Sequence, residues 1–279
     1  MLIKQAWVRA LLFFIAYVGV YFASGAAVGI VWALRHGLAN ANKLLNDPTL
    51  TMAVLLCSSI SLIGVALLFR KLVDRQSIVS MGFAWKGHGH EAAAGVLLGL
   101  ILPGAGSLIL YATGHLDWLD TVFDARALGT GLLLFTLTAF SEEIAFRGYI
   151  LNNLLQQQNK WVALAVSTLL FALIHLGNAN LNPVAFLNLV AGGLLLGLNY
   201  VYTRNLWFSI CFHLSWNFFQ GPILGYEVSG LGLQSLWHME RQGGVLLTGG
   251  AFGFEGSIIA TLLLALAIGL VWQRSWWKR

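Results

Sequence analysis

Long apolar stretches recur along the whole chain, and short polar segments separate them. A helix needs about 20 predominantly apolar residues to cross the ~30 Å hydrocarbon core of a bilayer. Eight stretches are candidates for such spans: 10–34, 50–69, 92–113, 127–152, 161–176, 183–203, 206–221 and 256–273. The fifth and the seventh are short for a span. The pattern predicts an all-α fold, a polytopic membrane bundle of about eight transmembrane helices.

Two segments interrupt this regular pattern, and the first apolar stretch could be mistaken for a signal peptide. Pro103 and Gly104 lie inside the third stretch and predict a kink, which neighbouring helices can accommodate. Residues 221–256 contain ten glycines and predict a long outer loop before the last helix. The first stretch is longer than the roughly 7–15 apolar residues of a signal peptide, so we expect an uncleaved span.

The composition agrees with a membrane protein. Hydrophobic residues make up 58% of the 279 residues, charged residues make up 10%, and the mean hydropathy is +0.76. Soluble domains carry about 25% charged residues, so the composition excludes an ordinary water-soluble fold. The net charge of +5 comes from basic residues scattered over the loops, which argues against a nucleic-acid partner and for membrane topology.

Basic residues are distributed unequally between the two sides of the predicted bundle. With eight spans, both termini lie on the same side. That side collects eleven basic residues: Lys4, Arg9, Arg70, Lys71, Arg75, Lys86, Lys160, Arg204, Arg274, Lys278 and Arg279. The opposite side has four: Arg35, Lys43, Arg126 and Arg241. Because loops rich in Lys and Arg stay in the cytoplasm, we predict a multi-pass protein of the cell membrane with both termini cytoplasmic.

Glu142 and Glu143 lie inside the fourth apolar stretch. A carboxylate at bilayer depth costs about 2.5–3.5 kcal/mol on insertion scales, so a pair of them indicates a functional site. Arg147 follows Glu143 by four residues, the favoured spacing for a helical ion pair. We therefore predict that Arg147 holds Glu143 and that Glu142 points into a cavity. The alternative is a charge cluster at the membrane surface.

Two histidines and an asparagine add polar groups to other apolar stretches. His175 ends the fifth stretch, and His213 and Asn217 lie four residues apart on one face of the seventh. A lone membrane histidine more often packs between helices, but titratable groups that converge in one bundle are typical of a buried active site. In straight spans His175 lies at the outer end and Glu142 near the middle. The groups therefore meet only if the fifth helix is tilted or starts deeper.

These residues form three motifs in order on successive membrane segments: Glu142-Glu143-x3-Arg147, Phe171-x3-His175 and His213-x3-Asn217. With them the sequence resembles the CPBP family, the CAAX-protease and bacteriocin-processing membrane endopeptidases. The stretch from Asn199 to Asn217 and the Thr248-Gly249-Gly250 region are also similar to this family. The resemblance covers roughly residues 125–260, whereas the first three helices match by hydropathy only.

The resemblance implies an enzyme, an intramembrane endopeptidase. In this family a glutamate and the first histidine activate a water that attacks a peptide carbonyl, and the second histidine and the asparagine hold the oxyanion. Carried over to this sequence, the residues are the general base Glu142 with His175, the oxyanion donors His213 and Asn217, and the supporting pair Glu143 and Arg147. The implied substrate is a peptide or a membrane protein, with or without a lipid. The implied role is either peptide maturation or bacteriocin self-immunity.

The resemblance also divides the chain into three parts. Residues 1–126 hold the first three transmembrane helices, and residues 127–260 form a catalytic core similar to CAAX proteases. Residues 261–279 are the end of the last helix and a cytoplasmic tail.

A zinc-dependent version of the same protease is an open alternative. Two histidines, a carboxylate and an open position describe a catalytic zinc site, for which the ligands would be Glu142, His175 and His213. The sequence has no His-Glu-x-x-His motif, and an asparagine lies where a third strong ligand is expected. We therefore predict a reaction without a metal or another cofactor.

Two functions of other classes are also open. A proton-coupled transporter would relay protons through the same buried Glu/His cluster. Such transporters favour inverted repeats, and residues 1–140 show no correspondence with residues 141–279. A scaffold or immunity protein without proteolytic activity would retain the motifs, and an activity assay separates it from a protease.

Overall fold

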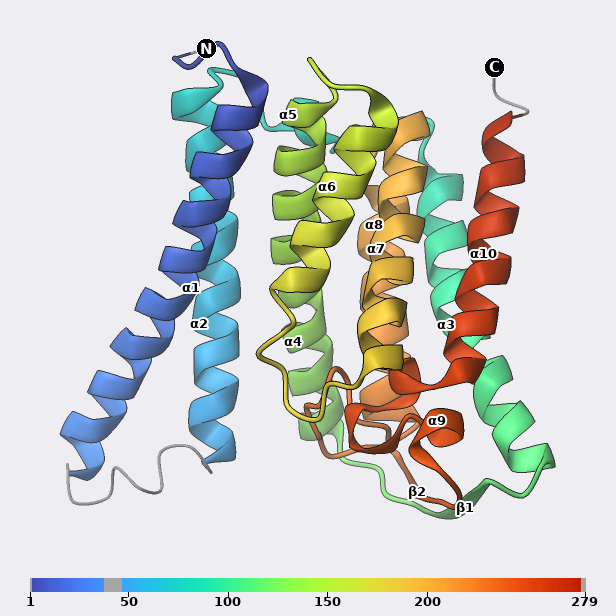
Figure 1. The fold of residues 1–279 in the computed structure, drawn as a ribbon. Coiled ribbons are helices and arrows are strands. Elements are labelled where there is room, and N and C mark those ends of the chain that lie inside the picture. Colours follow the sequence, from blue (N-terminus) through green and yellow to red (C-terminus); the bar gives the residue numbers. More distant parts are fainter. Residues whose placement is uncertain (1, 38–46, 277–279) are drawn as a thin grey trace.

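The computed structural model describes residues 2–37 and 47–276 and shows a bundle of long helices (Figure 1). The long helices are α1 (Ala6–His36), α2 (Pro48–Leu68), α3 (Gly89–Ala112), α4 (Ala125–Glu143), α6 (Lys160–Leu173), α7 (Pro183–Thr203), α8 (Trp207–Phe218) and α10 (Ile258–Trp276). The first described helix begins and the last one ends at the same end of the bundle (Figure 1). Lys43, Lys278 and Arg279, and with them the end of the predicted tail, lie outside the described residues.

Six of the described helices are long and apolar enough to cross a membrane. They are Ala6–His36, Thr49–Val73, Gly89–Ala112, Ala125–Leu154, Lys160–Gly177 and Pro183–Thr203. The other two predicted spans fold as the shorter helix α8 and as α10, whose apolar part is Ile258–Gln273. The predicted fold class, an all-α polytopic membrane bundle, is confirmed.

Polar residues just before several helices determine where those helices begin. Asp47 precedes α2, and its carboxylate accepts hydrogen bonds from the backbone N–H groups of Thr49 and Leu50. Asp124 caps α4 in the same way, which lowers the pKa of its carboxyl. The Asn182 side chain caps α7, and a proline follows both Asp47 and Asn182. Caps of this kind satisfy backbone donors that have no partner within the helix, and Pro suits the first helical position.

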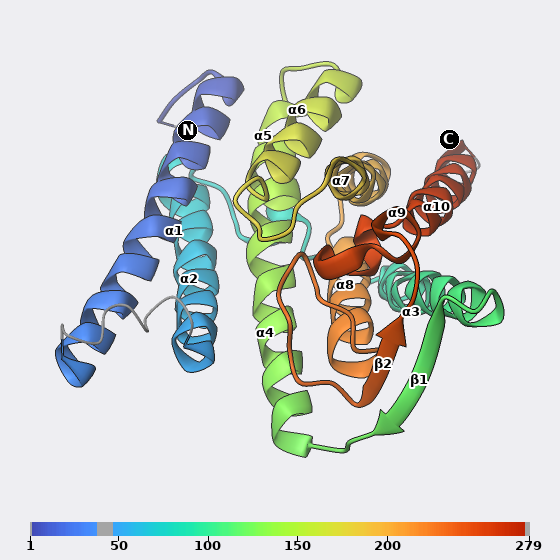
Figure 2. The same cartoon turned by 60° about the horizontal axis from the view of Figure 1, so that its bottom comes forward.

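The end of the bundle that carries the longer connections is covered by irregular chain and a short two-stranded sheet. β1 (Leu116–Thr121) pairs antiparallel with β2 (Trp237–Arg241), with a bulge between Trp118 and Asp120. Figure 2 shows both strands lying across this end of the bundle. The predicted loop 221–256 thus contains a strand, the short helix α9 (Val245–Thr248) and two tight turns, Gly250–Phe252 and Phe254–Gly256.

At the opposite end, a buried group of charges joins α1 and α2 to the chain that follows α4. We call Arg9, Arg70, Asp74, Tyr149 and Asn153 the Asp74 cluster. Asp74 Oδ1 lies 3.2 Å from Arg9 Nε and accepts a 3.1 Å hydrogen bond from Tyr149. Its Oδ2 lies 2.8 Å from Arg70 Nη1 and accepts a 3.1 Å hydrogen bond from Asn153. Both oxygens of this fully buried carboxylate are therefore satisfied.

Helix α3 packs closely against α8 because glycines face α8. A Cβ atom at Gly95 would overlap the Phe208 carbonyl, and one at Gly99 would overlap the Ser215 hydroxyl. The Ser215 hydroxyl donates a 3.1 Å hydrogen bond to the Val96 carbonyl across the same interface. Small residues four apart let helix backbones approach in membranes. The absence of a side chain at Gly95 and Gly99 thus determines how closely α8 lies to α3.

Candidate active site

The two glutamates lie where α4 changes its helical geometry. Glu142 and Glu143 are the last two residues of α4, and a π-helical turn, Ile144–Leu151, follows without a break. Such wide turns are frequent at functional sites. The turn contains Arg147, whose Nη1 donates a 2.8 Å hydrogen bond to Glu143 Oε1. The ion pair expected from the spacing is present, and both of its side chains are buried.

Arg147 also contacts the neighbouring helices. Its Nη2 donates a 3.1 Å hydrogen bond to the Gly193 carbonyl of α7. Its guanidinium lies 4.4 Å from the centre of the Phe171 ring, a cation–π contact. The phenylalanine of the second motif therefore packs on the arginine of the first.

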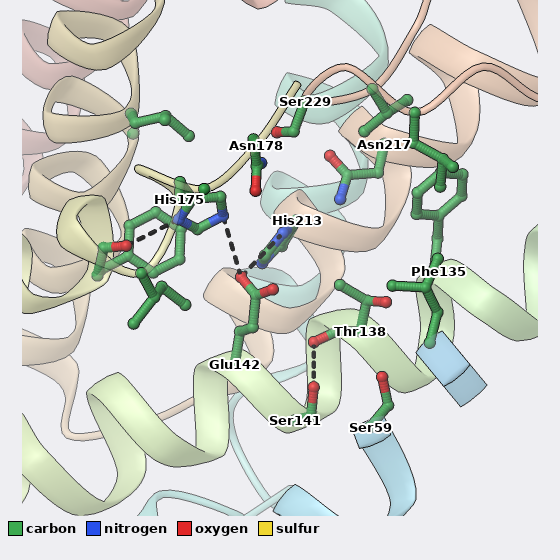
Figure 3. Close-up of a pocket in the computed structure, with 18 of the residues that line it drawn as sticks. Ser59, Phe135, Thr138, Ser141, Glu142, His175, Asn178, His213, Asn217 and Ser229 are labelled. Atoms are coloured by element: carbon green, nitrogen blue, oxygen red, sulfur yellow. Dashed lines mark hydrogen bonds and ion pairs between the residues drawn. The ribbon is translucent and has the colours of Figure 1, made fainter. Parts of the chain in front are cut away.

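Both histidines approach Glu142, although they come from different helices (Figure 3). His175 lies in the turn just after α6, and His213 lies in the middle of α8. The Nε2 atom of each histidine lies 3.9 Å from Glu142 Oε2. The structure thus answers the question of depth, because α6 ends at Leu173 and the turn after it carries His175 to the level of Glu142.

The hydrogen bonds of each histidine indicate which ring nitrogen carries the proton. His175 Nδ1 lies 2.8 Å from the Phe171 carbonyl oxygen, which can only accept. His213 Nδ1 lies 3.0 Å from Glu143 Oε1, which already accepts from Arg147. Both Nδ1 atoms are therefore donors, and in a neutral ring the Nε2 that faces Glu142 is the acceptor.

We call Glu142, Glu143, Arg147, His175 and His213 the Glu142 cluster. Three of its polar atoms are buried and have no hydrogen-bond partner among the described residues: Glu142 Oε2, Glu143 Oε2 and Arg147 Nε. A buried polar atom without a partner costs about 1–3 kcal/mol. Such atoms are typical of positions that are selected for chemistry and not for stability.

A cavity of about 810 Å³ lies over this cluster, lined by Glu142, His175, His213 and Asn217 together with residues of α1, α2 and α7. The Asn217 amide points into it (Figure 3). Within the described residues, this amide makes no side-chain hydrogen bond, so its N–H₂ group is available to a ligand. All four predicted catalytic residues thus line one cavity.

Two features of the site were absent from the sequence-based prediction. The contact of His213 with Glu143 joins the supporting ion pair directly to a candidate oxyanion donor. Glu255, in the turn before α10, also lines the cavity. Glu255 lies in the segment Phe252-Gly253-Phe254-Glu255-Gly256, which carries no sequence signal that places it at the cavity.

The side chains of the Glu142 cluster include the ones a zinc-dependent reaction would use. In the parts of the chain that the structure describes, no group of three or more His, Cys, Asp or Glu side chains has the arrangement of a metal site. The zinc ligands considered from the sequence, Glu142, His175 and His213, bring their Nε2 and Oε2 atoms together, each Nε2 lying 3.9 Å from Glu142 Oε2.

The central part of the chain is similar to a known protein family. Residues 124–219 match the family described as Type II CAAX prenyl endopeptidase Rce1-like. This segment is therefore similar to that family, and we call it the Rce1-like domain. The similarity to CAAX proteases expected from the three motifs is thereby confirmed for this segment, and the long apolar helices show a multi-pass membrane protein. A comparison with curated proteins finds no match.

The Rce1-like domain coincides with structural boundaries. It begins at Asp124, which caps α4, and it ends at Phe219, directly after α8. It therefore contains all the residues of the three motifs. The Thr248-Gly249-Gly250 region and Glu255 lie beyond it, as do α1 and α2, which contribute residues to the cavity.

Proposed function

We propose that this protein is an intramembrane endopeptidase in which Glu142 and His175 activate the attacking water. The observation that carries the proposal is the convergence of two histidines on one carboxylate oxygen, both Nε2 atoms lying 3.9 Å from Glu142 Oε2. That separation is too long for a direct hydrogen bond, and it suits a bridging water. The name of the matching family, a prenyl endopeptidase, indicates the same class of reaction.

The first step is the attack of water on the peptide carbonyl. A water between Glu142 and His175 gives one O–H to Glu142 Oε2 and the other to His175 Nε2, both of which accept. Glu142 takes its proton as the oxygen bonds to the carbonyl carbon. A positioned general base contributes about 10²–10⁴-fold to such a step. The same proton then passes from Glu142 to the leaving nitrogen when the C–N bond breaks.

The negative charge that develops on the carbonyl oxygen is held by His213 and Asn217. Because His213 Nδ1 already donates to Glu143, a donor at Nε2 requires the doubly protonated ring. Glu143 stabilises this cation through its contact with Nδ1. Arg147 contacts Glu143 and not the Nε2 side of the ring, so Nε2 can donate to the substrate. The two carboxylates and the two cations, Arg147 and protonated His213, then form an electrically neutral set, which lowers the cost of burying them.

The cavity lining indicates the substrate class. Aromatic and aliphatic side chains of α1 and α2 also line the cavity, among them Phe14, Phe22 and Leu55. A peptide segment from the membrane, with or without a lipid, fits such a lining. On this proposal the protein lies in the cell membrane with both termini in the cytoplasm, as the distribution of basic residues indicates.

Cleavage of internally quenched peptides by the purified protein in detergent tests the activity. We expect the wild type to cleave and the Glu142→Ala and His213→Ala variants to lose cleavage, while the exposed Glu240→Gln variant cleaves normally. Equal cleavage by all four proteins would show that the assigned site is wrong. Reversible loss of wild-type activity with EDTA or phenanthroline would replace the metal-free mechanism by the zinc-dependent one.

Cysteine labelling tests the orientation. We expect Asp120→Cys to react with a membrane-impermeant reagent from outside and Arg75→Cys only from the cytoplasmic side, since both positions are exposed. The reverse pattern would contradict the charge argument.

A further inference from the structure

Glu255 is a third carboxylate of the cavity, and it is held in place by neighbouring segments. It lies in the turn Phe254–Gly256 that directly precedes α10. Its Oε1 accepts hydrogen bonds from the backbone N–H and, at 2.7 Å, from the hydroxyl of Ser229. The backbone carbonyl of Glu255 accepts a 2.8 Å hydrogen bond from the Asn188 amide of α7. These contacts fix one carboxylate oxygen and leave Oε2 as the one that can bind a ligand.

Among the described residues, Glu255 has no Lys or Arg as an ion-pair partner, in contrast to three other carboxylates of the protein. Asp74 contacts two arginines, Glu143 contacts Arg147, and Glu227 lies 2.7 Å from Arg241. Within the described residues, no Lys or Arg lies within ion-pair distance of Glu255, and none lines the cavity. Burial raises the pKa of Glu255, against the opposing effects of the Ser229 hydrogen bonds and the two histidines. A cationic ligand beside Glu255 would offset the cost of burying its ionised carboxylate.

The position of Glu255 complements that of Glu142. Ser229, which holds the Glu255 carboxylate, lies across the two histidines from Glu142 (Figure 3). A peptide whose carbonyl lies between Glu142 and His213 therefore passes Glu255 within a few residues of the bond that breaks. Since the Glu142 cluster is neutral when His213 is protonated, Glu255 adds one negative charge without a counter-charge. A cationic side chain of the substrate supplies it.

We propose that Glu255 determines specificity by binding a Lys or Arg side chain of the peptide substrate close to the scissile bond. This inference rests on the proposed endopeptidase function, because only a peptidase makes the bound peptide a substrate. The binding of the peptide itself does not require cleavage. Both can therefore be tested separately.

The test measures binding in a protein that does not cleave. Glu142→Gln protein in lipid nanodiscs is titrated into fluorescent peptides that differ at one position only, Lys against norleucine, and the anisotropy gives the two Kd values. We expect the Lys peptide to bind at least about tenfold more tightly, a modest value for a desolvated charge pair. This comparison uses the native Glu255 and so does not depend on the folding of a second variant.

Variants then locate the preference. Adding Glu255→Gln, which keeps the acceptor for Ser229 and removes the charge, should bring the ratio of the two Kd values to about one. The matched control Glu240→Gln removes a carboxylate from the exposed face of β2 and should leave the ratio unchanged. Glu255→Lys should reverse the preference toward a peptide with Glu at the same position.

The outcomes separate the two proposals. Equal Kd values for the Lys and norleucine peptides, or a Lys preference that survives Glu255→Gln, would overturn the role of Glu255. A uniform fall of kcat in Glu255→Gln without a change in peptide preference would also overturn it, since it would indicate a positioning role. A Lys preference in binding together with no cleavage by the wild type would support the Glu255 site and contradict the endopeptidase.

Discussion

The Asp74 cluster and the Glu142 cluster are both buried and both include residues of the chain from α4 to α5 (Asn152–Leu154), yet their polar atoms differ in how many hydrogen bonds they make. In the first, each oxygen of Asp74 has two partners, from Arg9 and Tyr149 on one side and from Arg70 and Asn153 on the other. In the second, one oxygen of each glutamate has no hydrogen-bond partner among the described residues. The first arrangement joins helices, and the second leaves acceptors facing a cavity.

The Asp74 cluster thus contributes to stability, whereas the Glu142 cluster has groups available for chemistry. A buried carboxylate with all of its hydrogen bonds made fixes the elements around it, and removing a partner is costly. Buried acceptors that face a cavity lower stability, and they are available to a water or a substrate. Glu143 belongs to both arrangements, because it is paired with Arg147 and also contacts His213.

The largest effect is expected from Glu143→Gln, which combines both kinds of loss. Arg147 would be left buried without its counter-charge, so the free energy of unfolding should fall by about 3–5 kcal/mol. Cleavage should fall by at least about 100-fold, because the protonated form of His213 loses its support. Urea titrations in detergent and peptide cleavage measure the two effects. The same change at Glu142 should remove cleavage without lowering stability, and equal destabilisation by both changes would contradict the comparison.

Asp74→Asn should affect stability alone. Arg9 and Arg70 lose the charge of a fully buried partner, so we expect unfolding to become easier by about 3–5 kcal/mol. Because Asp74 does not line the cavity, kcat measured well below the unfolding temperature should stay within about twofold of the wild type. A large fall in kcat with unchanged stability would show that the two clusters are coupled.

Asn217→Ala should affect chemistry alone. Loss of one oxyanion donor lowers kcat by about 10²–10³-fold. The free energy of unfolding should change little, since the Asn217 amide has no hydrogen-bond partner among the described side chains and backbone groups. Asn217→Asp keeps the shape and replaces the donor with an acceptor, so it should be impaired at least as much. An active Asn217→Asp protein would rule out an oxyanion role for this residue.

The smallest effect is expected at an ion pair outside both clusters. Asp120 lies 2.9 Å from His238 across β1 and β2, and both side chains are about half exposed. Exposed pairs contribute less than about 1 kcal/mol, so Asp120→Asn should leave the urea midpoint nearly unchanged. A shift as large as that of Asp74→Asn would mean that burial is not what distinguishes the clusters.

Local spacing predicted some of the site and could not predict the rest. The four-residue spacings correctly indicated the contact of Arg147 with Glu143 and the shared cavity of His213 and Asn217, because neighbours on one helix face are determined by helical geometry alone. The depth of His175 was not predictable, since it depends on the residue at which α6 ends and on the turn that follows. Hydropathy likewise indicated the helices better than it indicated which of them are long enough to span.

Contacts between distant segments were out of reach for a different reason. β1 and β2 are separated by more than a hundred residues, and neither carries a pattern that specifies the other. Glu255 reaches the cavity because the turn before α10 is held by Ser229 and Asn188, two residues far from it in the chain. A single carboxylate in a glycine-rich segment gives no indication of such a long-range position.

The close approach of α3 to α8 limits which substitutions in α3 the protein can accept without loss of activity. Among the described residues that line the cavity, none comes from α3, but α8 carries His213 and Asn217 at a distance from α3 that Gly95 and Gly99 determine. A single methyl group at Gly99 would collide with α8 backbone and push the helix aside. A misplacement of about 1 Å can cost ~10²-fold in rate. Purifying selection on catalysis should therefore reach two residues that have no side chain and never meet the substrate.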